Sequence, residues 1–374
     1  MRASRTKTRL ALSAAVMLAL FLAVELTLRV QGFAPLEGAR SDPTWSVLRA
    51  SEDPVLAYEL IPGARGQVFE CDVRVNSFGF RGPEWAPVPA EGTRRIVVLG
   101  DSVTFGNHIA EGDTFCAVAE RRLRAEGHAV EWLNLALTGY DTLQEARCLE
   151  LHGLALKPGL VIVGYCMNDA GMVSVELEQL ERLQRYDHPV FGLRVAQWFA
   201  QRHERTRVAR GVQQRNEDAS FARLNAGTML EVALDAELSA SVELVRRRLA
   251  ERDSTPPAWS PLPWYASNAH VGRLAFGMAE LGRVARLGGV PVLVVILPPL
   301  KEKPHLAAYE AAFALVERLA RREGFDVLEL ASGLRTNDDL HVLPKDFIHF
   351  NVEGHRRIGE TLARELVARG LLAR

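Results

Sequence analysis

The first thirty residues combine a basic start with one long apolar run. Residues 1–9 carry four basic side chains and no acid, and residues 10–30 contain only two charges, Glu25 and Arg29. A helix over residues 10–30 would reach about 31 Å, close to the thickness of a bilayer core. We predict an uncleaved membrane anchor, with a cleaved secretory signal as the alternative. Because basic flanks stay in the cytoplasm, either one places the rest of the chain outside it.

The next segment, residues 31–93, is rich in proline, glycine and short alternating stretches. Residues 68–75 alternate loosely between apolar and polar positions, which is typical of a half-buried strand. Residues 76–83, Asn-Ser-Phe-Gly-Phe-Arg-Gly-Pro, follow as a turn-rich stretch. We therefore predict a spacer and a small β-element packed on the main domain.

Between residues 94 and 370, short apolar runs alternate with amphipathic helical patterns. The apolar runs predict strands at 96–99, 130–135, 160–163, 290–297 and 325–330. The helical patterns cover 114–126, 142–155, 267–287, 305–323 and 352–369. Strands separated by helices require right-handed crossovers, so the prediction is an α/β domain with a parallel sheet and helices on both faces. In such sheets, ligands bind beyond the carboxyl ends of the strands.

Residues 171–262 interrupt this alternation and are too long for a simple connection. They contain helical stretches, five arginines between residues 202 and 215, and a proline-rich exit. We predict a helical insertion. It would form either a lid over the site or an excursion into solvent away from it, and the sequence favours neither.

The overall composition excludes several classes of protein. There are 45 Lys and Arg against 46 Asp and Glu, a net charge of −1, and 48% of the residues are apolar. This is the composition of a folded globular protein, and it gives no electrostatic case for a nucleic-acid partner. Cys71, Cys116, Cys148 and Cys166 lack the C-x-x-C spacing of zinc or thioredoxin-like sites, and the sequence assigns them no disulfide pairing. The oligomeric state is not predicted.

A serine follows the first strand of the α/β domain at a sharp turn. The stretch from Gly100 to Gly106, Gly-Asp-Ser-Val-Thr-Phe-Gly, leads from this strand into a helix and places Ser102 at the carboxyl edge of the sheet. Seen alone, a serine in this position is more often a helix cap. After the last strand, Asp346 and His349 are spaced so that the carboxylate can reach the ring of the same turn. The carboxylate would fix the ring tautomer, and the other ring nitrogen would take a proton from Ser102.

Two further strand ends carry hydrogen-bond donors. Gly139 follows the second strand, and Asn168 follows the third. Acyl transfer needs donors aimed at the developing oxyanion, and the N–H groups of Ser102 and Gly139 with the Asn168 amide would supply three. A turn glycine and an asparagine that caps its own loop are the commoner explanations for each residue alone. Four such elements at strand ends in this order favour one reacting centre.

Other side chains near these motifs are predicted to be structural. Asp101 would bond within its own turn, with a supporting role at the site as the alternative. His355 would pack at the start of the last helix, and His108 has no partner in the pattern. Cys166 lies close to Asn168 in sequence but has no base beside it, so we expect a buried, inert thiol.

The order GDS, G, ND and D-x-x-H resembles the SGNH, or GDSL-like, hydrolase family over about residues 94–370, apart from the insertion. The resemblance implies a flavodoxin-like three-layer α/β/α fold with a five-stranded parallel sheet. It also implies ester-hydrolase or acyl-transfer chemistry without a metal or cofactor. By this resemblance, Ser102 would be the nucleophile and His349 the base, with Asp346 as the partner of the base. Gly139 and Asn168 would be the two further oxyanion donors. Residues 76–81 and the N-terminal helix resemble bacterial membrane-anchored members of the family.

These observations predict a serine esterase that is anchored in a bacterial inner membrane with its catalytic domain in the periplasm. It would hydrolyse acyl esters, including acetyl esters, of envelope glycans or lipids through an acyl-enzyme. The compartment alone suggests this substrate class. One alternative is an O-acyltransferase acting on a polysaccharide with the same residues. Another is a catalytically silent binding module on the same fold.

Overall fold

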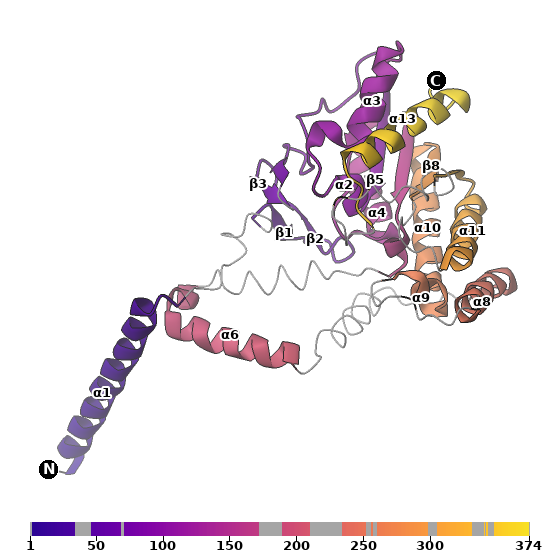
Figure 1. The fold of residues 1–374 in the computed structure, drawn as a ribbon. Helices are drawn as coiled ribbons and strands as arrows, with labels where there is room; N and C mark the ends of the chain where they lie inside the picture. Colours follow the sequence, from indigo (N-terminus) through magenta and orange to yellow (C-terminus); the bar gives the residue numbers. More distant parts are fainter. Residues whose placement is uncertain are drawn as a thin grey trace.

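The computed structural model describes most of the chain, in segments separated by gaps. The described residues are 2–33, 46–68, 71–171, 189–209, 234–251, 256, 260–297, 305–330, 340, 342 and 348–373. Figure 1 shows a long N-terminal helix, a small β-element and a larger α/β domain.

The α/β domain is built on a parallel sheet of five strands. The strands are β5 (Arg94–Gly100), β6 (Val130–Asn134), β7 (Leu160–Tyr165), β8 (Val292–Ile296) and β9 (Asp326–Glu329). They pair in the order β6-β5-β7-β8-β9, with every neighbouring pair parallel. The chain moves from β5 to β6 on one side and then to β7 on the other, and ligands of α/β sheets bind at the carboxyl ends of the strands at such a switch point. The predicted flavodoxin-like sheet is confirmed.

Alternate residues of the central strands point to opposite faces of this sheet. In β5, Ile96 and Val98 belong to one buried cluster, and Val97 and Leu99 belong to the other. The first face is covered by α3 (Phe115–Ala125) and α13 (Val352–Ala368). The second is covered by α4 (Thr142–Cys148), α10 (Asn268–Gly288) and α11 (Leu306–Arg322). Both faces are therefore buried, which explains why the central strands read as continuous apolar runs.

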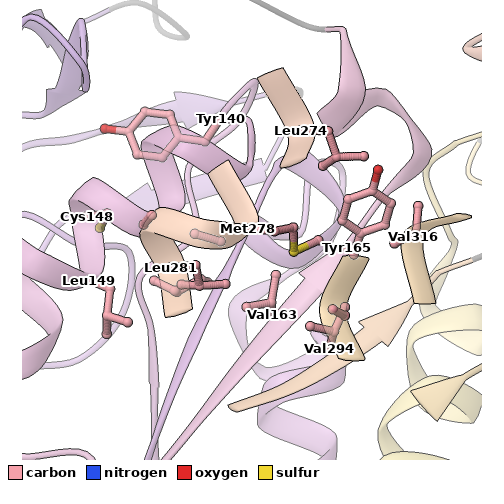
Figure 2. Packing of buried hydrophobic residues seen from close by; sticks show 14 of the residues in the cluster. Tyr140, Cys148, Leu149, Val163, Tyr165, Leu274, Met278, Leu281, Val294 and Val316 are labelled. Atoms are coloured by element: carbon pink, nitrogen blue, oxygen red, sulfur yellow. The ribbon is translucent and has the colours of Figure 1, made fainter. Parts of the chain in front are cut away.

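Figure 2 shows the packing on the second face. Met278 and Leu281 of α10 gather with Val163 of β7 and Val294 of β8. All four side chains are at most 1% exposed, so α10 covers the middle of this face of the sheet.

Two predicted boundaries differ from the structure for local reasons. The predicted strand 290–297 begins later, at Val292, because Pro291 has no N–H to donate to the sheet. The predicted helix 142–155 changes after Cys148 into a π-helical turn, Leu149–Gly153, and then a 3-10 turn, Leu154–Leu156. A Cβ at position 153 would lie 2.7 Å from the Leu149 side chain of the same turn and 3.6 Å from that of Val97 in β5, so glycine leaves room for this turn against the sheet.

The segment before the sheet forms two antiparallel hairpins. Strand β1 (Leu48–Ala50) pairs with β2 (Tyr58–Leu60), and β3 (Arg65–Val68) pairs with β4 (Cys71–Arg74). The predicted single strand 68–75 is wrong, because Val68 pairs with Cys71 and the segment folds back on itself. The predicted β-element is present, and its side chains join the same buried cluster as the second face of the sheet.

The remaining helices are α1 (Arg2–Val30), α2 (Ser102–Phe105), α6 (Arg194–Ala209), α8 (Ala236–Ala250) and α9 (Leu262–Tyr265). Within α1, the stretch Arg9–Val30 has a mean hydropathy of 2.2, so it is long and apolar enough to cross a membrane, as a signal sequence would also be. Helices α6 and α8 lie within the predicted insertion. Helix α8 buries Leu238, Val242 and Val245 and packs against α11, whereas α6 lies beside the end of α1 (Figure 1).

Candidate active site

Ser102 begins α2 directly after β5. Gly100 makes the turn with φ at +153°, and a Cβ there would lie 2.2 Å from Thr104 Oγ1, so the position requires glycine. The Asp101 carboxylate caps α2 by accepting the N–H of Val103 at 2.9 Å. The turn and the cap together hold the Ser102 side chain at the carboxyl end of the sheet.

The imidazole of His349 meets this serine. Ser102 Oγ and His349 Nε2 lie 2.8 Å apart, although 247 residues separate them in the chain. His349 lies between β9 and α13, and its loop is held by the bond from the N–H of Asn351 to the Leu340 carbonyl, 2.8 Å. Asp346 lies outside the described residues. The serine and the imidazole are in the contact expected of a nucleophile and a general base.

Two backbone donors near this pair have no acceptor among the residues that the structure describes. In the described part of the chain, neither the N–H of Ser102 nor that of Gly139 donates a hydrogen bond. Gly139 has φ at +80°, a left-handed conformation that favours glycine. The amide of Asn168 donates to Asp101 Oδ2 at 2.8 Å, which fixes the orientation of its NH2 group. Donors without an acceptor are what a developing oxyanion requires.

The loop that carries Gly139 is tied to the serine turn. The N–H of Leu137 donates to the Gly100 carbonyl at 3.1 Å. The hydroxyl of Thr138 bonds to Asn107 Oδ1 at 2.8 Å. These bonds couple the position of Gly139 to that of the residues around Ser102.

Asp101 connects the serine with the asparagine. Its Oδ2 accepts the bond from the Asn168 amide, and the Ser102 hydroxyl lies 3.4 Å from the same oxygen. Burial raises the pKa of the Asp101 carboxyl, while the bonds from Asn168 and from the Val103 N–H oppose that shift. The alternative weighed from the sequence, a supporting role at the site, describes this arrangement better than a bond confined to its own turn.

More carboxyl groups lie buried behind the Asn168 loop. Asp169 accepts the N–H of Cys166 at 3.0 Å and closes the 3-10 turn Met167–Ala170. Burial, together with the negative charges of Asp101 and Asp141, raises the pKa of Glu145 well above its ordinary value. Among the residues that the structure describes, no group of three or more His, Cys, Asp or Glu side chains could hold a metal ion.

The model of the GDSL-like lipase/acylhydrolase family matches residues 98–357, a span that begins in β5 and ends in α13. This chain belongs to that family. It is an ester-hydrolysing enzyme, as the sequence predicted.

Solved structures of similar fold include TesA, with 15% identity and a TM-score of 0.41, covering 73% of this chain and 98% of that chain. A lipase/acylhydrolase from Enterococcus faecalis has 16% identity and a TM-score of 0.40, covering 74% of this chain and 96% of that one. The acetyl xylan esterase AlAXEase has 10% identity and a TM-score of 0.39, covering 73% and 99%. No curated protein matches the sequence significantly.

The sequence interpretation missed Arg81, which lies against the serine helix of this GDSL-like enzyme. Its guanidinium is buried and donates to the carbonyls of Phe105, Gly106 and Ile109 at 2.9, 2.8 and 2.6 Å. It also stacks over the Phe105 ring, with 5.1 Å from Cζ to the centroid. Arg81 comes from the stretch 76–83, which the sequence analysis described as turn-rich and similar to membrane-anchored members of the family, without assigning Arg81 a role. A buried arginine of the β-element thus closes the C-terminal end of α2.

Tyr58 was also missed, and it supports the other side of the site. Its hydroxyl donates to the carbonyl of Thr138, the residue before Gly139, at 2.6 Å. In return, the hydroxyl of Tyr140 donates to the Tyr58 carbonyl at 2.7 Å. Nothing in the local sequence of Tyr58 indicates these contacts, because both partners lie about eighty residues further along the chain.

Among the histidines, His108 is not the ordinary residue that the sequence suggested. Its ring lies edge-on to that of His349, with 5.8 Å between centroids, and its backbone has φ at +64°. His355 behaves as expected, because it stacks on Phe115 and accepts the N–H of that residue at 3.1 Å. Burial lowers the pKa of His355 to about 3, so the ring stays neutral.

The cysteines play no visible part at this site. None of the four forms a disulfide. Burial raises the pKa of the Cys166 thiol well above its ordinary value, with the charges of Asp101 and Asp169 adding to the shift. Cys166 is therefore a buried, protonated thiol.

Proposed function

We propose that this enzyme hydrolyses acyl esters through a covalent acyl-enzyme on Ser102. The observation that carries the proposal is the 2.8 Å contact between Ser102 Oγ and His349 Nε2, together with the N–H groups of Ser102 and Gly139, which have no acceptor in the described part of the chain. His349 takes the hydroxyl proton while Oγ attacks the ester carbonyl carbon. The oxyanion that forms accepts hydrogen bonds from the N–H groups of Ser102 and Gly139 and from the Asn168 amide.

The rest of the cycle uses the same groups in reverse. The protonated His349 gives its proton to the departing alcohol as the tetrahedral intermediate collapses to the acyl-enzyme. A water molecule then loses a proton to His349 and attacks the acyl carbon, which releases the carboxylic acid and restores Ser102. We assign Asp346 the task of stabilising the imidazolium, on the strength of its D-x-x-H spacing and the family pattern.

For the location, we propose an anchor in the bacterial inner membrane and a catalytic domain on the outer side. The basic residues before the apolar helix α1 support this orientation. Residue 46 lies 13 residues after residue 33, so the start of the β-element is at most about 45 Å from the end of α1. The candidate substrates are therefore acyl esters of envelope glycans or lipids.

The test is turnover of a panel of acyl p-nitrophenyl esters by the full chain in detergent. Ser102→Ala should abolish turnover and labelling by a fluorophosphonate, whereas Ser241→Ala, a change at a half-buried serine of α8, should retain both. Equal rates for Ser102→Ala and the unaltered enzyme would overturn the proposed mechanism. Adding a polysaccharide acceptor separates the two outcomes for the acyl group, because a transferase would acylate the acceptor and a hydrolase would release free acid.

A further inference from the structure

Helix α6 begins against the outer end of the apolar helix α1. The carboxylate of Glu25 accepts the N–H of Arg194 and the N–H of Val195, each at 2.9 Å. These are the first two N–H groups of α6, which have no acceptor within their own helix. Glu25 therefore caps α6 from a different helix, and the residue is buried in doing so.

A second residue of α1 strengthens this junction. Arg29 Nε donates to Glu25 Oε1 at 2.8 Å, and Arg29 also donates to the carbonyl of Gly192 at 3.1 Å. Gly192 belongs to the turn directly before α6. The start of α6 is thus tied to α1 by a carboxylate and a guanidinium together.

The junction lies at a defined depth. Glu25 comes five residues before Val30, the end of the apolar stretch, which corresponds to about 7 Å along a helix. Amphipathic helices that lie on a bilayer are buried about 5–10 Å into the boundary between headgroups and acyl chains. Figure 1 shows α6 turning away from the axis of α1 instead of continuing it. A helix that leaves a spanning helix at this level runs along the membrane surface.

The exposed side chains of α6 suit such a surface. Val195, Trp198 and Phe199 share one face by their i, i+3, i+4 spacing. Trp198 is 38% exposed and Phe199 is 61% exposed, although both are large and apolar. The guanidinium of Arg202 lies over the Trp198 ring, 5.6 Å from its centroid. Aromatic rings next to arginine are typical of the membrane–water interface.

The charge of α6 also favours contact with a lipid surface. Its sequence contains four arginines and one glutamate, so the helix is strongly basic while the whole chain is close to neutral. Basic residues beside a spanning helix are attracted to anionic lipid headgroups.

We propose that α6 is an interfacial helix on the outer surface of the membrane, with Trp198 and Phe199 among the upper acyl chains and Arg202 at anionic headgroups. This inference depends on the proposed anchor but not on the esterase mechanism. It gives the chain a second attachment to the bilayer.

The test places the full chain in vesicles of phosphatidylcholine and phosphatidylglycerol whose acyl chains are brominated either near the glycerol end or near the terminal methyl. Bromine quenches a tryptophan at its own depth. The unaltered chain should show quenching by the shallow label that Trp198→Phe loses. The control Trp264→Phe, a change in the α/β domain, should leave the lipid-dependent quenching unchanged.

Three results would overturn the proposal. If Trp198→Phe and the unaltered chain show the same quenching, lipid does not cover this face, and a protein partner or a second copy of the chain becomes the alternative. Stronger quenching of Trp198 by the deep label would place the residue within the bilayer core and not at its surface. If alkaline carbonate releases the chain from the vesicles, α1 does not span the bilayer, and the proposal loses the anchor on which it depends. Ester turnover, measured on the same samples, should be equal in all variants and reports separately on the proposed function.

Discussion

The β-element before the sheet and the insertion after β7 are both additions to the α/β domain, yet they are connected to it in different ways. The β-element reaches both sides of the candidate site, since Arg81 binds the end of α2 and Tyr58 binds the loop of Gly139. The insertion follows Asn168 directly in sequence, but its described helices go elsewhere, α8 onto α11 and α6 onto α1. Closeness in sequence to a functional residue therefore does not indicate which addition supports the site.

From this contrast we expect variants of the β-element to lower turnover, and variants of the insertion to lower stability while turnover is kept. The largest effect on turnover is expected for Arg81→Met, which removes the donors to three buried carbonyls. Each acceptor left without a partner costs about 1–3 kcal/mol, and a displacement of α2 by about 1 Å would lower kcat about 100-fold. The measurement is kcat well below the melting temperature. Arg121→Met, which removes a bond from an exposed arginine to the carbonyl of Gly112, is the control and should be silent.

A smaller loss of turnover is expected for Tyr58→Phe. This change removes one hydrogen bond to the carbonyl of Thr138, worth about 0.5–1.5 kcal/mol, so kcat should fall by up to about tenfold. KM should change little, because the bond positions the Gly139 donor and does not touch the substrate. Tyr309→Phe, the same change in α11, should keep full kcat. A kcat for Tyr58→Phe equal to that of the control would remove the β-element from the support of the site.

A third prediction concerns how stability depends on pH through the buried Glu145 of α4. The folded-state pKa of Glu145 is raised, so the folded protein binds this proton more tightly than the unfolded chain does. Stability should therefore fall as pH rises above about 4.3, by up to about 1.4 kcal/mol per pH unit, until the folded-state pKa is reached. Glu145→Gln removes this slope. Urea unfolding of both proteins from pH 5 to pH 8 measures the difference, which should grow in favour of the variant; parallel curves would contradict the prediction.

The smallest effect on turnover is expected in the insertion. Leu238→Ala empties a buried position where α8 packs against α11, which should cost about 2–5 kcal/mol of stability. We expect kcat to remain unchanged below the melting temperature, because the packing lies away from the serine turn. Thermal unfolding and kcat measured on one preparation test this. A parallel loss of both quantities would mean that α8 supports the site as the β-element does.

Much of the fold could be predicted because its signals are local. Residues 96–99 and 160–163 are apolar on both faces, as buried parallel strands must be. The alternation of strands and helices, joined by right-handed crossovers, predicts a parallel sheet. The same topology predicts that Ser102 and His349 lie at one edge of the sheet. The hairpin at Val68 and Cys71 was misread as one strand, since a loose alternation of apolar and polar residues does not reveal where the chain turns back.

The sequence by itself determined the strands, the helices that cover them, the glycine at position 100 and the apolar helix at the N-terminus, because each depends on residues that are neighbours in the chain. The tertiary structure decided that Arg81 and Tyr58 support the site, that His108 lies beside His349 and that Glu25 caps α6. Each of these contacts joins segments that are distant in sequence. The free energy of such a contact depends on whether folding brings a buried donor to an acceptor that has no other partner, and no local pattern encodes that.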